Sequence, residues 1–140
     1  MRWMLIFALA SLALAADLAG VKAEPNLEKR SDRALDNANL ALDAARDAYA
    51  RGEYDRSQTQ LDEVGASVDL AYQSLQQTGK DPRRSGHFKQ AEMRIRELLR
   101  RLEGMRQMVS FSDRPAVDKL RDHVSAIHDN LLDGIMSRRK

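Results

Sequence analysis

The stretch that decides the fold is Phe88–Val109, which reads FKQAEMRIRELLRRLEGMRQMV. Its apolar side chains recur in steps of three and four residues, which places them on one face of a helix. A helix with one continuous apolar face must bury that face against other elements. This apolar stripe consists of Phe88, Ala91, Ile95, Leu98, Leu102, Met105 and Val109. The arginines between them are Arg94, Arg96, Arg100, Arg101 and Arg106.

Three further segments repeat apolar side chains with the same period, and short polar breaks separate them. Gly52 ends the first, because glycine adopts the left-handed backbone conformation that closes a helix. Two glycines and a proline interrupt residues 79–86, and Ser112 or Asp113 can cap a helix that begins near Pro115. The sequence therefore predicts four helices, over about residues 26–51, 53–78, 86–109 and 113–136.

The second of these segments carries Tyr54, Leu61, Val68 and Leu75 seven residues apart, and all four are expected to face the core. Connections of a few residues force consecutive helices to run in opposite directions. The predicted fold is all-α, an antiparallel up-down-up-down four-helix bundle that forms a single domain over residues 24–140. Two long hairpins that pair with those of a second chain are the alternative, so we expect a monomer or a homodimer.

The first turn has a counterpart in a known family. Residues 48–55, AYARGEYD, resemble the hairpin turn of a tetratricopeptide repeat, in which Gly-Asp/Glu-Tyr joins two helices. The resemblance covers this turn alone, because no second copy follows about 34 residues later and the second helix continues where such a repeat stops at proline. It implies a tight hairpin and assigns no peptide-binding residues.

The beginning of the chain is typical of a secretory signal peptide. A positively charged end precedes an apolar run over residues 3–16, and small residues follow. We assign residues 1–23 to the signal peptide, with cleavage after Ala23; cleavage after Ala15 or Ala16 is the alternative. The run is shorter than the roughly 20 apolar residues that cross a bilayer. No stable membrane span is therefore expected once the signal is removed.

The 140 residues contain no cysteine. This excludes disulfides, thiolate metal sites and covalent attachment of a c-type haem. An exported chain of this kind is expected in the bacterial periplasm or in the medium. No serine elbow and no motif that pairs a histidine with a nucleophile is present. We therefore assign no catalytic residue and expect the chain not to be an enzyme.

The histidines carry the cofactor hypothesis. His123 and His128 stand five residues apart, about 140° around a helix, so they cannot chelate one ion together. The positions four residues from each carry Lys, Ile, Val and Leu, which excludes the His-carboxylate spacing of di-metal bundles. We expect no cofactor and no metal. A small-ligand or haem- or metal-binding bundle, with a methionine such as Met105 or Met108 as second haem ligand, is the alternative function.

Charge is distributed unevenly along the chain. Residues 24–79 carry a net charge of −5 and residues 80–140 a net charge of +6, which predicts attraction between the two halves. Most arginines of the Phe88–Val109 helix have acidic neighbours one turn away, such as Glu92 for Arg96 and Glu97 for Arg101. Arg94 has no such neighbour. With no aromatic side chains on that face, the pattern argues against a nucleic-acid partner.

The cations around the third helix's start are the candidate binding site. They lead into a helix N-terminus, where free amides favour an anion or an acidic surface. The loop is not a phosphate-binding P-loop, because Ser74 and Asp81 stand where glycine and Ser/Thr are required. We expect an interaction with an envelope protein or an acidic surface, or else an ordinary solvated connection. The candidate residues are Lys80, Arg83, Arg84, His87 and Lys89.

Overall fold

The computed structural model describes residues 17–137, and helices account for 84% of them. No described residue lies in a strand, which confirms the expected all-α class. The alternative cleavage points after Ala15 and Ala16 lie outside the described residues. Within residues 17–137, no helix is both long and apolar enough to cross a membrane.

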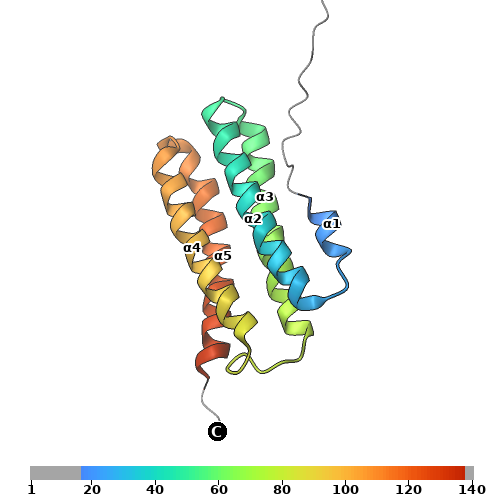
Figure 1. Cartoon of the computed structure of the whole chain (residues 1–140). Helices are drawn as coiled ribbons and strands as arrows, with labels where there is room; N and C mark the ends of the chain where they lie inside the picture. Colours follow the sequence, from blue (N-terminus) through green and yellow to red (C-terminus); the bar gives the residue numbers. More distant parts are fainter. Residues whose placement is uncertain (1–16, 138–140) are drawn as a thin grey trace, which may run out of the picture.

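Four long helices follow the four segments with helical periodicity, and two short helices accompany them (Figure 1). The short helix α1 lies inside the range 1–23 that the sequence assigned to a signal peptide, and periodicity did not reveal it because it is barely more than one turn long. The elements in chain order are α1 Leu18–Lys22, α2 Leu27–Ala50, α3 Tyr54–Gln77, α4 Gly86–Met108, the 3₁₀ helix η1 Phe111–Asp113 and α5 Arg114–Met136.

The apolar stripe of α4 is buried as its spacing predicts. Ile95, Leu102 and Met105 are completely buried, and no member of the stripe is more than 4% exposed. Met93, which lies outside the stripe, is 63% exposed. Burying one large apolar side chain contributes about 1.5–3 kcal/mol, so this stripe anchors α4 in the core.

The stripe predicted for α3 is only partly correct. Leu61, Val68 and Leu75 are at most 4% exposed, but Tyr54 is 58% exposed and does not belong to the core. Tyr54 is the first residue of α3, directly after the turn, so its side chain lies at the end of the helix pair. Its ring packs edge-on against Tyr49, with the two ring centroids 5.1 Å apart.

The first hairpin, α2 with α3, is packed through small side chains. Ala38, Ala41 and Ala45 are completely buried, and side chains of this size let two helices approach closely. Ser57 Oγ donates a hydrogen bond to the Ala45 carbonyl across the interface, at 2.8 Å. Gly52, in the turn, has φ +76°, a conformation that favours glycine.

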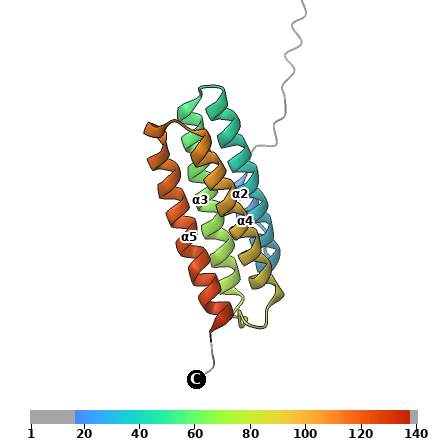
Figure 2. The same cartoon turned by 90° about the vertical axis from the view of Figure 1, so that its left-hand side faces the viewer.

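The second hairpin, α4 with α5, lies beside the first (Figures 1 and 2). Helices that follow one another in the chain run in opposite directions, but α2 lies next to α4 and α3 next to α5, and these neighbours run in the same direction. The predicted antiparallel relation therefore applies within each hairpin, whereas the two hairpins meet through parallel helices. Residues 78–85 allow this, because eight residues span up to about 26 Å and can connect α3 to the diagonally opposite α4.

Charged side chains join the two hairpins, as the acidic and basic halves predict. Arg94 binds the carboxylate of Asp36 on α2, and its Nη1 donates to the Asp32 carbonyl at 3.1 Å. Arg101, seven residues further on, binds Asp43, which is seven residues beyond Asp36. Equal steps on both helices are possible because α2 and α4 are parallel. Each such exposed pair contributes about 0.2–1 kcal/mol. The pairs therefore fix how α4 is aligned along α2 more than they stabilise the fold.

The ion pairs predicted within α4 are partly replaced. The Glu92–Arg96 pair is present, with Arg96 Nη2 2.6 Å from Glu92 Oε2. Glu97 is bound by Arg100 instead of Arg101, since Arg101 is engaged by α2. Spacing within one helix predicts the wrong partner here, because Asp43 on the neighbouring hairpin competes with Glu97 for the guanidinium of Arg101.

Candidate functional site

The candidate cations before and at the start of α4 do not converge on one anion site. Lys80 Nζ and His87 Nε2 both contact the carboxylate of Glu28 on α2. The hydrogen bond from Lys80 is the main cause that holds the pKa of Glu28 below its usual range, and His87 acts in the same direction. Lys80 and His87 therefore connect the α3–α4 loop and the first turn of α4 to the first hairpin.

Arg83 is held inside the loop itself. Its Nη2 lies 2.8 Å from Asp81 Oδ2 and its Nε 3.1 Å from Asp81 Oδ1. These hydrogen bonds, with one from the Arg83 backbone, lower the pKa of Asp81 to about 2. Within residues 17–137, Arg84 and Lys89 form no ion pair, so they are the members of the predicted set left for an external anion.

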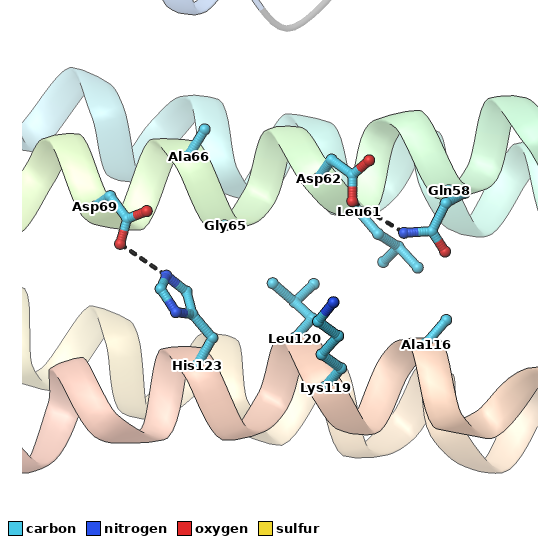
Figure 3. Close-up of a pocket in the computed structure, with 10 residues that line it drawn as sticks. All are labelled: Gln58, Leu61, Asp62, Gly65, Ala66, Asp69, Ala116, Lys119, Leu120 and His123. Atoms are coloured by element: carbon cyan, nitrogen blue, oxygen red, sulfur yellow. Dashed lines mark hydrogen bonds and ion pairs between the residues drawn. The ribbon is translucent and has the colours of Figure 1, made fainter.

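A different part of the molecule is concave. A groove of about 590 Å³ runs between α3 and α5, where the two hairpins meet through parallel helices (Figure 3). Leu61 and Leu120 form its apolar floor and are 4% and 9% exposed. Ala116 is a small lining residue, and Gly65 lets Leu120 approach α3 closely, since a Cβ added at Gly65 would lie 3.3 Å from Leu120 Cδ1.

Polar side chains form the rims of this groove (Figure 3). His123 Nε2 on α5 lies 2.7 Å from Asp69 Oδ1 on α3 and bridges the two helices. Gln58 Nε2 donates to Asp62 Oδ1 at 2.9 Å. In the described part of the chain neither Asp62 nor Lys119 takes part in an ion pair, so each rim presents one charge that a ligand can neutralise.

The groove extends toward the turn between α2 and α3. A smaller hollow of about 60 Å³ shares Gln58, Leu61 and Ala116 with it and reaches Tyr49. From Gln58 to Asp69 the groove follows α3 for about 16 Å at 1.5 Å rise per residue, or three helical turns. This length suits a short helix or an elongated ligand better than a compact one.

The His123–Asp69 pair has the composition of a general-base dyad, but its surroundings favour binding. The two side chains are 49% and 40% exposed, so water weakens the electrostatic interaction between them. None of the ten described residues that line the groove carries a hydroxyl or thiol that His123 could activate. The groove offers apolar area with a charge on either side, and no hydroxyl or thiol among its lining residues.

The second histidine of the cofactor hypothesis lies on the other side of α5, in an ion cluster. His128 Nε2 is 2.9 Å from Glu92 Oε1, and Arg96 binds both oxygens of the same carboxylate. Arg96 is the main cause that lowers the pKa of Glu92, and His128 adds to it. Met105 is buried in the core and Met108 is 40% exposed. Residues 17–137 contain no group of three or more His, Cys, Asp or Glu placed to hold a metal.

Sequence reasoning did not find the groove. It correctly assigned Leu61 to an apolar stripe, but the stripe of one helix does not show where two neighbouring helices leave space between them. The pair Gly65-Ala66 on α3, with Ala116 on α5, is the signal that could have indicated it. Small residues also fill the tight α2–α3 interface, so composition alone does not distinguish close packing from a hollow.

No family model, curated protein or solved structure matches this chain.

Proposed function

We propose that this chain is an exported, non-enzymatic four-helix bundle of the bacterial envelope, periplasmic or secreted, with a structural or protein-interaction role. The signal-like residues 1–23 support export. The observation that carries the interaction role is the α3–α5 groove, which combines an apolar floor with one charge on each rim, Asp62 and Lys119.

The occupant that fits this groove is a short amphipathic helix of an envelope protein. Three turns of groove match three turns of an incoming helix, whose apolar side chains can cover Leu61 and Leu120. A lysine and a glutamate on its flanks can pair with Asp62 and Lys119. The chain acts as a monomer or a homodimer, and in the second case the occupant can be a helix of the second copy.

A photo-crosslinking amino acid placed in the groove tests this role. Position 116 lies in the groove, whereas position 126 is exposed on the same helix and does not line it. We expect a discrete crosslinked product from position 116 in intact cells, which mass spectrometry identifies, and none from position 126. Equal or absent crosslinking at the two positions would reject the groove as the interaction site.

The loop cations that remain without a partner supply a second test. If an acidic surface docks beside the start of α4, replacing Arg84 and Lys89 by alanine will weaken recovery of the product crosslinked at position 116. Arg83→Ala serves as a control, because Arg83 is already neutralised by Asp81. Unchanged recovery in the double variant removes the loop from the interaction and leaves the groove.

A small-ligand function is the second candidate, because the groove volume of about 590 Å³ falls within the range of about 300–1,000 Å³ typical of ligand sites. Native mass spectrometry of the protein purified from its own envelope separates the two. A bound small molecule that is lost in Ala116→Trp would favour this candidate. Addition of haem tests its haem version, since histidine ligation would sharpen the Soret band and shift it from the position seen with free haem.

A further inference from the structure

The segment before the long helices is part of the folded body. Helix α1, Leu18–Lys22, lies against the first hairpin on the side opposite α4 and α5 (Figure 1). Asp17 caps it: the Asp17 carboxylate accepts a hydrogen bond from the Gly20 backbone N–H at 3.2 Å. Val21 is only 6% exposed and joins the hydrophobic core, and Leu18 packs against that core.

The residues that follow α1 are fastened to α2. Arg33 Nη1 lies 3.0 Å from Glu24 Oε2, and Arg30 Nε donates to the Glu24 carbonyl at 2.8 Å. Asn26 Oδ1 accepts from the Lys29 backbone N–H at 2.9 Å and caps α2. The chain from Asp17 into α2 therefore follows one defined path, with a cap at the start of each helix.

This path distinguishes between the possible signal cleavage points. Cleavage after Ala23 would remove Val21 from the core and delete the whole of α1. Cleavage after Ala15 or Ala16 would leave both in place. The three residues before the Ala23–Glu24 bond also form the end of α1 and its cap.

We propose that the mature protein begins at Ala16 or Asp17 and keeps α1 as a folded part of the domain. For cleavage after Ala15, Ala13 and Ala15 supply the small pair that the peptidase reads. Water adds across the peptide bond, which leaves a carboxylate on the last residue of the signal and a new amine on the first residue of the mature chain. The inference rests on the proposed export. It replaces the assignment of residues 1–23 to the signal with a signal that ends before Asp17.

The decisive measurement is the intact mass and N-terminal sequence of the full-length gene product, expressed in a Gram-negative host and recovered from the periplasm. We expect an N-terminus at Ala16 or Asp17. An N-terminus at Glu24 would overturn the inference and leave export standing. A chain that remains in the cytoplasm with Met1 in place would overturn export and, with it, this inference.

The variant Val21→Asp provides a second, independent readout. An aspartate at position 21 destroys the small pair before Ala23 but leaves Ala13 and Ala15 intact, so processing should yield the same N-terminus as the parent. Because Val21 is buried in the mature protein, we expect the melting temperature to fall by about 5 °C. Val21→Ala, which preserves the small pair, should show a smaller fall. Accumulation of unprocessed Val21→Asp precursor, or a melting temperature equal to that of the parent, would overturn the inference.

Discussion

Replacing Gly65 by alanine tests whether the α3–α5 interface is as open as the groove implies. A glycine inside a helix costs about 0.5–1 kcal/mol relative to alanine, so the substitution gains that amount from the backbone. The new methyl would lie 3.3 Å from Leu120 Cδ1, slightly closer than an ordinary contact. Leu120 borders the groove and can move its methyl group into that space. We therefore expect the free energy of unfolding to rise by about 0–1 kcal/mol.

Gly104 is the matched control. It lies inside α4, and a Cβ added there would meet nothing within 4 Å. Gly104→Ala should gain the full backbone term of about 0.5–1 kcal/mol, and Gly65→Ala should gain no more than this. Urea unfolding followed by circular dichroism measures both, provided that the slope against urea stays constant. If Gly65→Ala destabilises the protein by more than about 1 kcal/mol while Gly104→Ala stabilises it, the interface is tightly packed and the groove is not available to a ligand.

Three further predictions concern the core, the ion cluster and the turn. Leu102→Ala should lower the free energy of unfolding by about 2–5 kcal/mol and Met93→Ala by less than about 0.5 kcal/mol, because Leu102 is buried and Met93 is exposed. Urea unfolding measures both, and similar losses in the two variants would mean that the apolar stripe is misplaced. Arg96 lowers the pKa of Glu92 in the folded protein below its ordinary value of 4.5. The stability that this carboxylate contributes is therefore present above pH 4.5 and is lost as the pH falls through the lower pKa of the folded state. The midpoint of urea unfolding should decline less between pH 6 and pH 3 in Glu92→Gln than in the parent. Tyr49 OH accepts from the backbone N–H before η1 and donates to a carboxylate, so Tyr49→Phe should cost about 1–3 kcal/mol in thermal unfolding, and no loss would show that water replaces the hydroxyl.

The class of fold follows from sequence because helical periodicity is local. The α4 stripe is buried at every position, and the helix ends fall at glycine, proline and capping residues whose effect depends on a few neighbours. Tyr54 marks the limit of this reasoning. It keeps the seven-residue spacing of its stripe, but a helix end lies beyond the core, and a periodic pattern does not record where the neighbouring helices stop.

The candidate site was predictable only in part, because the partner of a charged side chain is chosen across helices. Lys80, Arg83 and His87 were correctly placed in and beside one loop, but their carboxylates, Glu28 among them, decide that they are not free. Arg83 pairs with Asp81 inside the loop, whereas Arg84, the next residue, has no ion pair within the described residues.

The sequence by itself determined the all-α class, the four long helices, which face of each is apolar, and the opposite charge of the two halves, because each depends on side-chain spacing along one helix. Only the tertiary structure decided that the hairpins meet through parallel helices, that a groove opens between α3 and α5, and that α1 packs on the first hairpin. These features depend on how two surfaces fit when brought together, and the free energies that choose between such fits are a few kcal/mol spread over contacts distant in sequence.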